Sequence, residues 1–304
     1  MSFQYKQDRY GTYGGLSIGF ENLIKANAII QGVPFESGTS GKKGTSFAID
    51  SLRQICGDIQ LISRRGVSIT DMKICDVGNV PVFPLDSETT RNSIAKSMKF
   101  LCSKTSAPII TIGGDHSITY SEIKGLSSLG SIGIIWFDAH RDLLNEMLSS
   151  PYSHGSSLRR SIELDSVDPK NILLIGTRYM EPEEQEFVDK EGINELTQAK
   201  LEDAENPRKL VKKQIGEIIP RVDHLFVSID IDCLDPAHAP GTGTPVGGGM
   251  TTSQLMNYIW DIPAPIRALD IVEVSPPLDV SGITLKVVLA LLTEVLAKIK
   301  LQNQ

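Results

Sequence analysis

Side chains that bind metal ions gather in two short segments, where they stand at alternate positions. The first segment has two aspartates around a histidine and the second has two aspartates one residue apart: Asp138, His140 and Asp142, then Asp230 and Asp232. In extended backbone, residues i, i+2 and i+4 point to the same side. Five potential ligands therefore face one spot, and His116, after a separate apolar segment, supplies a sixth.

The charge of this cluster favours metal ions over the usual roles of acids at strand ends. A single aspartate in such a place is more often a helix cap or a turn residue. Four carboxylates at the mouth of apolar strands, however, would repel one another and lose hydration. Alternation points the one basic side chain of the two segments, Arg141, away from them. Two divalent cations would balance the four negative charges.

The donor types narrow the choice of ion and indicate the chemistry. Carboxylate oxygens and imidazole without a thiolate suit Mn²⁺ and leave Zn²⁺, Fe²⁺, Co²⁺ and Ni²⁺ open. Cys233 points opposite to Asp232 and is interpreted as a small core residue. A pair of ions lowers the pKa of a bridging water toward neutrality and makes it a strong nucleophile. This predicts hydrolysis of an unreactive centre, for which a resonance-stabilised carbon is one candidate.

Short apolar runs that alternate with helical patterns must position these residues. Continuous apolar runs are typical of strands buried on both faces, and we expect them at 28–33, 108–112, 132–137, 172–175, 225–231 and 268–274. Helices are expected at 45–56, 90–104, 121–129, 182–190, 207–219, 252–259 and 283–299. This alternation predicts an α/β fold with a mostly parallel sheet, whose ligands bind beyond the carboxyl ends of the strands. No linker divides the sequence, so we expect one domain over 1–304.

Composition excludes several classes of function. The chain has 304 residues and a net charge of −7, which argues against nucleic acid as a partner and weakly favours small cations. No uncharged apolar run reaches the roughly 20 residues that a membrane span needs, and the N-terminal sequence lacks the apolar core of a signal peptide. No two of the four cysteines have a C-x-x-C spacing, so we expect reduced thiols and a cytoplasmic protein. We expect no membrane partner.

Five motifs together resemble those of the ureohydrolases, the family of arginase, agmatinase and guanidinobutyrase. They are GGDHS (113–117), DAHRD (138–142), SIDIDCLDP (228–236), GTGTP (241–245) and DIVEVSPP (270–277). The resemblance extends from Gly32 to the C-terminal helix. Three positions depart from the family pattern, none of them a ligand: Arg141, His238 and Asp50. The resemblance implies a three-layer α/β/α fold and a manganese enzyme with two ions per chain that cleaves a guanidinium group into urea and an amine.

The resemblance also implies a role for each site residue. His116 and Asp142 would bind one ion, and Asp142 would also orient the hydroxide. His140 and Asp232 would bind the other ion, and two residues would bridge both, Asp138 and Asp230. His154 matches the family's mobile histidine, which would protonate the leaving amine. Glu273 would pair with the guanidinium nitrogens.

The substrate is expected to be a small cationic guanidino compound, with agmatine first. The segment 143–153 should hold its tail, and it differs from the arginase pattern. Asn145 and Glu146 are its strongest polar groups, and Glu146 would attract a cationic amine. The alternatives are 4-guanidinobutyrate, for which Arg159 or Arg160 offers a cation, and arginine.

Two further hypotheses and an assembly state complete the predictions. One alternative is a homologue that binds metal without catalysis, although no ligand is missing. Another is a zinc deacetylase on a related fold, which would hold one ion instead of two. The resemblance also implies a homo-oligomer, either a trimer or a hexamer.

Overall fold

A single parallel sheet dominates the computed structural model, which describes residues 11–302. Within these residues the sheet has eight strands in the order β2-β1-β3-β8-β7-β4-β5-β6. Their bounds are β1 Ala28–Gly32, β2 Ile74–Asn79, β3 Ile109–Ile112, β4 Ile132–Phe137, β5 Ile172–Ile175, β6 Asn194–Leu196, β7 His224–Asp230 and β8 Ala268–Val272. Every residue of β1, β3, β4, β5 and β8 is buried, which explains why their sequences are largely apolar.

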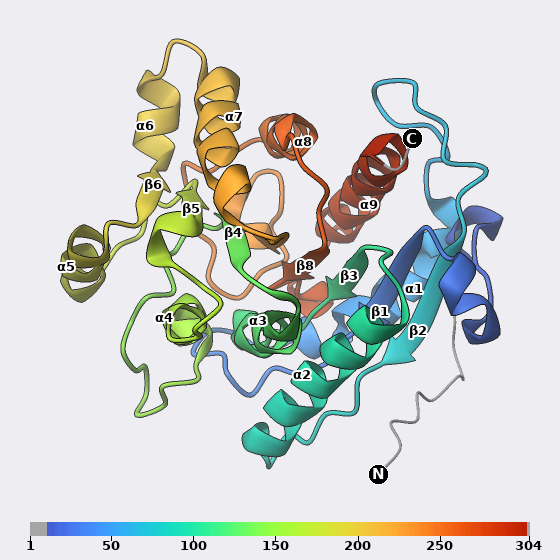
Figure 1. The fold of residues 1–304 in the computed structure, drawn as a ribbon, viewed down its shortest axis with the longest axis horizontal. Coiled ribbons are helices and arrows are strands. Elements are labelled where there is room, and N and C mark those ends of the chain that lie inside the picture. Colours follow the sequence, from blue (N-terminus) through green and yellow to red (C-terminus); the bar gives the residue numbers. More distant parts are fainter. Residues whose placement is uncertain (1–10, 303–304) are drawn as a thin grey trace.

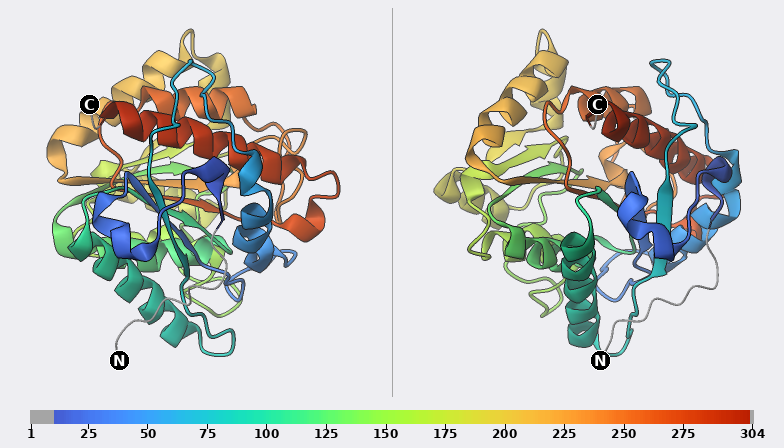
Figure 2. Two further views of the ribbon diagram at one scale, coloured as in Figure 1. Left: turned by 90° about the vertical axis from the view of Figure 1, so that its right-hand side faces the viewer. Right: turned by 45° about the vertical axis from the view of Figure 1, so that its right-hand side comes forward.

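Helices cover both faces of the sheet and complete three layers (Figures 1 and 2). One hydrophobic core joins the sheet to α1, α7, α8 and α9, and a second joins it to α2, α3, α4 and α5. The bounds are α1 Ala48–Ile55, α2 Ser87–Lys104, α3 Thr119–Leu126, α4 Ser157–Ile162, α5 Pro182–Glu191, α6 Gln198–Asp203, α7 Pro207–Ile218, α8 Thr252–Asp261 and α9 Ile283–Gln302. The predicted α/β fold with a mostly parallel central sheet is confirmed.

Local sequence signals fix several of the helix ends. Asp86 caps α2 by accepting a hydrogen bond from Thr89 N at 3.0 Å, so this helix begins three residues before the predicted Thr90. Pro182 and Pro207 occupy the first positions of α5 and α7, where the missing N–H costs nothing. Gly192 ends α5 with φ +69°, a conformation that favours glycine.

The edges of the sheet differ from prediction. Neither β2 nor β6 was expected, because Asp76 and Gly78 interrupt the apolar run of β2 and β6 has only three residues. The short helices α4 and α6, of six residues each, were not among the predicted helix ranges. The four central strands of the sheet are, in order, β3, β8, β7 and β4. The predicted ligands lie on these strands or just after them, or the strands end beside the site. Their carboxyl ends therefore meet, as the fold type requires.

No helix within 11–302 is long and apolar enough to cross a bilayer. The four cysteines, all within the described part of the chain, are free thiols. Most of the N-terminal segment on which we based the absence of a signal peptide, residues 1–10, lies outside the described residues. The single domain, the cytoplasmic location and the oligomeric state stay predictions.

Candidate active site

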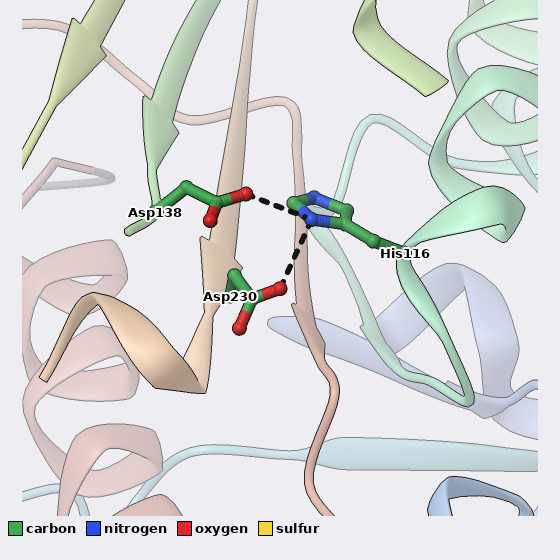
Figure 3. Close-up of side chains that lie close together, drawn as sticks. All are labelled: His116, Asp138 and Asp230. Atoms are coloured by element: carbon green, nitrogen blue, oxygen red, sulfur yellow. Dashed lines mark ion pairs between the residues drawn. The ribbon is translucent and has the colours of Figure 1, made fainter. Parts of the chain in front are cut away.

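The predicted ligands meet at the carboxyl ends of the central strands. His116 opens a short 3₁₀ helix (His116–Ile118) after β3, Asp138 follows β4 directly, and Asp230 is the last residue of β7. Figure 3 shows the imidazole of His116 facing the two carboxylates, with His116 Nδ1 3.1 Å from Asp138 Oδ2 and 3.2 Å from Asp230 Oδ2. Asp142 Oδ2 lies 3.0 Å from the same nitrogen. One nitrogen and three carboxylate oxygens thus converge on one point.

A second group lies beside the first and shares Asp138 with it. His140 Nδ1 is 3.4 Å from Asp138 Oδ1 and 3.3 Å from Asp232 Oδ2. Asp138 therefore turns one oxygen to each group, as a bridging ligand would. The two groups with metal-ligand geometry are His116, Asp138 and Asp230, and Asp138, His140 and Asp232. All six side chains predicted to bind metal are brought together, and Asp230 approaches the first group.

The unpaired nitrogen of His116 tests whether a cation fits. His116 Nδ1 is buried and makes no hydrogen bond, although three carboxylates surround it. Its other nitrogen, Nε2, lies 2.8 Å from Ser228 Oγ, and that hydroxyl donates to Asp270 Oδ1 at 2.6 Å. Because Ser228 uses its single hydroxyl hydrogen in the bond to Asp270, its oxygen accepts the hydrogen of His116 Nε2. Nδ1 is thus the nitrogen that faces the three carboxylates, and it is the atom of His116 that would ligate a metal ion.

The electrostatics of the cluster lead to the same conclusion. Burial, followed by the negative charges of neighbouring carboxylates, raises the pKa of Asp142 to about 6 and that of Asp230 well above its usual range. Buried carboxylates this close disfavour the ionised form unless a cation compensates them. Oxygen donors combined with imidazole fit a hard or intermediate divalent ion such as Mn²⁺.

Neighbouring groups hold the ligands in place. Trp136 Nε1 donates to Asp138 Oδ2 at 3.0 Å, and its ring stacks on His116 with centroids 4.1 Å apart. The backbone N–H of His140 donates to Asp138 Oδ1 at 2.7 Å. The backbone N–H of Asp232 likewise donates to Asp230 Oδ1 at 2.8 Å. These bonds orient the carboxylates before any ion binds.

His154 and Glu273 form a buried pair next to the metal ligands. His154 Nδ1 lies 3.0 Å from Glu273 Oε1, and the backbone N–H of Ser40 donates to His154 Nε2 at 3.1 Å. Burial alone would lower the pKa of His154, but the hydrogen bond and charge of Glu273 raise it to about 9. Glu273 Oε2 is buried without a donor. A proton carrier and a free carboxylate oxygen therefore lie side by side.

Two site residues adopt backbone conformations that are unusual for non-glycine residues. Asp142 has φ +56° and Glu273 has φ +60°. Such conformations are unfavourable and concentrate at functional sites, where the surrounding structure enforces them. At Asp142 the chain leaves the alternating pattern of the DAHRD segment.

A cavity of about 550 Å³ leads from solvent to these residues. At one end it is lined by His140, Asp142, His154 and Asp230. Its walls are largely apolar and include Leu144, Met147, Tyr179, Pro245 and Val246. A cavity of this size, closed by polar groups at one end, suits a small molecule with an aliphatic chain.

The acids that line this cavity are not the ones predicted for the tail of the substrate. Asn145 and Glu146 are exposed and lie outside it, because the chain turns back in a tight hairpin at Leu148. The cavity instead contains Glu181 and Glu184. They begin α5, beyond the carboxyl end of β5, and the strand prediction at 172–175 already pointed to this end of the sheet.

Glu181 and Glu184 are held by each other and by the backbone. Each side chain accepts a hydrogen bond from the other's backbone, as in a capping box. Glu184 also accepts from Leu143 N at 2.9 Å, and burial raises its pKa to about 7. Tyr179 Oη donates to Glu181 Oε1 at 3.2 Å. Ser40 and Tyr179 also line the cavity, and the motifs indicated neither of them.

The three residues that depart from the family pattern, Arg141, His238 and Asp50, do not line the cavity, and neither does Cys233. Arg141 points away from the cluster, as alternation predicts, and forms two hydrogen bonds to Glu195 at 2.7 and 2.8 Å. Cys233 is buried in a hydrophobic core, and burial raises the pKa of its thiol well above the usual value. Asp50 pairs with Arg53 on α1 at 3.2 Å. The shape of the cavity therefore does not depend on the Arg141 side chain.

Comparisons with known proteins decide the family. The sequence model of the arginase family matches residues 26–297. The chain belongs to the arginase family. This member is 32% identical over 269 residues to the agmatinase of Edwardsiella ictaluri, covering 85% of this chain and 83% of the relative. It is 30% identical over 275 residues to the guanidinopropionase of Pseudomonas aeruginosa, covering 87% and 84%.

The fold of this family member is close to that of solved structures. Formimidoylglutamase from Bacillus subtilis superposes with a TM-score of 0.90 at 25% identity, covering all of this chain and 96% of the other. The predicted resemblance to the ureohydrolases is confirmed. Its relatives act on different compounds, so the substrate must be argued from the cavity.

Proposed function

We propose that this member of the arginase family hydrolyses agmatine to putrescine and urea with two Mn²⁺ ions. The observation that carries the proposal is the pair of ligand groups that share Asp138 and open into an acidic cavity. When bound, the two ions would activate a water molecule for attack on the guanidinium carbon. His116 and Asp142 would hold one ion, and His140 and Asp232 the other, with Asp138 and Asp230 as the bridging ligands.

The remaining site residues would bind the guanidinium and transfer a proton. We assign acceptance of a guanidinium N–H to Glu273, whose Oε2 is buried without a hydrogen-bond donor and which is not among the residues that line the cavity. His154 has a raised pKa and is a proton donor for the leaving amine at neutral pH. Its contacts with Glu273 Oε1 and with Ser40 orient the imidazole.

The charge of the cavity supports a cationic tail. Among the described residues that line it, none is lysine or arginine, whereas Glu181 and Glu184 lie along it. Arg159 and Arg160, the cations considered for a carboxylate tail, are engaged elsewhere. The Arg159 guanidinium lies 3.5 Å over the Phe187 ring, and Arg160 donates to Asn145 Oδ1 at 3.1 Å. We therefore assign recognition of the amine to Glu181 in place of Glu146.

The first experiment measures urea release by the purified, Mn²⁺-loaded protein. Agmatine, arginine and 4-guanidinobutyrate serve as parallel substrates, and we expect turnover of agmatine above the other two. Because the fold is so similar to formimidoylglutamase, N-formimidoylglutamate is added and its hydrolysis followed as formamide release. Turnover of a substrate with a carboxylate tail in preference to agmatine would refute the assignment of the tail.

Two variants separate the candidates for tail recognition. Glu181→Gln should raise the KM for agmatine roughly tenfold, the loss of one partly buried charge pair worth about 1.4 kcal/mol. Glu146→Gln is the matched control, and it should leave KM unchanged because that side chain is exposed and outside the cavity. An increase in KM for Glu146→Gln but not for Glu181→Gln would restore the original prediction from the sequence.

A further inference from the structure

One wall of the cavity is a segment that belongs to no helix or strand. Residues 244–247 all line the cavity, and a run of three glycines, 247–249, continues from them. Gly247 and Gly248 have open space around them, and Gly248 has φ +76°. Because glycine has more conformational freedom than any other residue, such a segment is easily displaced unless other groups hold it. The position of the 244–247 wall must therefore be fixed from outside the segment.

The guanidinium of Arg178, which follows β5, holds this wall. Its Nη2 donates to Val246 O at 2.6 Å, and its Nε donates to Val246 O and Gly247 O, each at 3.2 Å. The same Nη2 also donates to Asp232 O at 2.7 Å and to Leu234 O at 3.3 Å. The two shortest of these bonds share one nitrogen, so a single atom of Arg178 ties the wall to the turn that carries Asp232.

Main-chain oxygens accept every side-chain hydrogen bond that Arg178 makes within residues 11–302. The two remaining bonds run from Nη1 to Gly176 O and to Cys233 O, each at 3.3 Å. The backbone N–H of Arg178 also donates to Ala139 O at 2.8 Å. A guanidinium carries five N–H donors in a rigid planar fork, so it can bind several carbonyl groups at fixed angles. Arg178 therefore joins segments of main chain to one another.

The glycine run that follows the wall also packs against Arg178. A Cβ at Gly249 would lie 2.7 Å from Arg178 Nη2 and 2.5 Å from Asp235 N, so this close approach requires glycine. Asp235 Oδ2 accepts hydrogen bonds from Gly248 N at 2.8 Å and from Gly249 N at 3.1 Å. Asp235 thus holds the glycine run, whereas Arg178 binds Val246 and Gly247, which line the cavity.

We propose that Arg178 is a positioning residue that sets the width of the substrate cavity by fixing residues 244–247 against the turn at Asp232. Arg178 does not itself line the cavity, so it acts through the wall. The inference rests on the proposed function only for the identity of the substrate. Pro245 and Val246 offer apolar surface to the aliphatic part of agmatine, so a displaced wall would weaken the binding of substrate and transition state alike. Loss of Arg178 should therefore raise KM and change kcat little.

The test compares the kinetics of Arg178→Met and Arg267→Met in the Mn²⁺-loaded protein. Arg267 is the matched control because it is also partly buried and donates to main-chain oxygens, Ala107 O at 2.7 Å and Thr105 O at 2.8 Å, but precedes the amino end of β8. Arg178→Met should raise the KM for agmatine roughly tenfold and keep kcat within about threefold of the wild type, whereas Arg267→Met should change neither. An unchanged KM in Arg178→Met, or a fall in kcat beyond about threefold, would overturn the proposal.

Hydrogen exchange followed by mass spectrometry measures the same effect without a substrate. Peptides that cover 244–250 should exchange roughly tenfold faster in Arg178→Met and at the wild-type rate in Arg267→Met. If Arg178→Met does not fold, Arg178→Lys takes its place, since lysine keeps the charge and three donors on a shorter side chain, and the increase should be smaller. Exchange at the wild-type rate in the variant that folds would overturn the proposal. If exchange is faster but no guanidine is hydrolysed, the proposed function fails and the role of Arg178 in holding the wall stands.

Discussion

Arg141 is expected to stabilise the fold without taking part in catalysis, although predicted metal ligands lie on both sides of it in the sequence. Its side chain is 1% exposed, and that of its partner Glu195 is 6% exposed. Arg141 donates to both oxygens of Glu195 and also to Gln185 Oε1 at 2.8 Å. The perturbation is Arg141→Met, which keeps much of the aliphatic volume and removes the charge.

The magnitude follows from the burial of the pair. Removing one partner of a buried ion pair leaves an uncompensated charge and costs about 3–5 kcal/mol of unfolding free energy. Glu195 keeps one hydrogen bond, from Thr177 Oγ1 at 2.8 Å, so we expect the lower end of this range. Arg208 provides a matched control because it pairs with Asp261 in the same two-bond geometry, at 2.7 and 2.8 Å, but its side chain is 45% exposed. Arg208→Met should cost about 1 kcal/mol or less.

Urea unfolding of the metal-free variants measures both costs under one condition. The double variant Arg141→Met/Glu195→Leu should recover most of the loss, because replacing both members of a buried pair by apolar residues is often nearly neutral. The KM for agmatine should stay close to the wild-type value in variants that remain folded. A cost for Arg141→Met no greater than that for Arg208→Met would refute the reasoning, as would a large change in KM at unchanged stability.

Three further predictions concern the proton donor, the ligands and a strained turn. In the proposed reaction His154 protonates the leaving amine and its pKa is raised to about 9, so kcat should fall as the pH rises above that value. Glu273→Gln removes the charge that raises this pKa and should move the fall to lower pH in the same rate profile. Trp136→Phe keeps the ring stacked on His116 but removes the hydrogen-bond donor to Asp138. Titration calorimetry should then show roughly tenfold weaker Mn²⁺ binding. Trp260→Phe is the control and should leave Mn²⁺ binding unchanged. Leu148 and Ser149 have φ +52° and +59°, in the region that favours Asn and Gly. Replacing them by Asn and Gly should therefore raise the unfolding free energy by about 1–2 kcal/mol. An unchanged free energy in urea unfolding would contradict a strained turn.

The central strands and the ligands could be predicted because their signals are local. The strands at 132–137 and 172–175 were placed with the observed bounds, since buried parallel strands are continuously apolar. Alternation predicted that Asp138, His140 and Asp142 share a side, and the structure brings the three together although Asp142, with φ +56°, departs from the extended pattern. Whether each ligand binds as assigned stays a prediction, although the structure places all six side chains together.

The tail-binding residues could not be predicted because they depend on tertiary packing. Glu146 was chosen for being near the ligands in sequence, but a hairpin turns it outward. Glu181 is 39 residues beyond Asp142 and reaches the cavity only because β5 lies beside β4 and α5 begins at its end. Arg178 follows the strand at 172–175, and its sequence gives no sign that it contacts Val246 and Gly247. Such residues are set by which elements meet in space.

The DAHRD segment explains how so many like charges can be kept together. Its alternate residues divide between two tasks, with Asp138, His140 and Asp142 turned to the metal cluster and the residues between them tied to the fold. Ala139 N donates to Asp232 Oδ1 at 3.2 Å, and Arg141 is bonded to β6 through Glu195. A cluster whose carboxylates repel one another stays assembled without ions only if the backbone that carries it is held independently. Arg141 fixes the backbone of the segment through its bonds to Glu195, on the side opposite to the predicted ligands. Its positive charge therefore does not occupy the place of a metal ion.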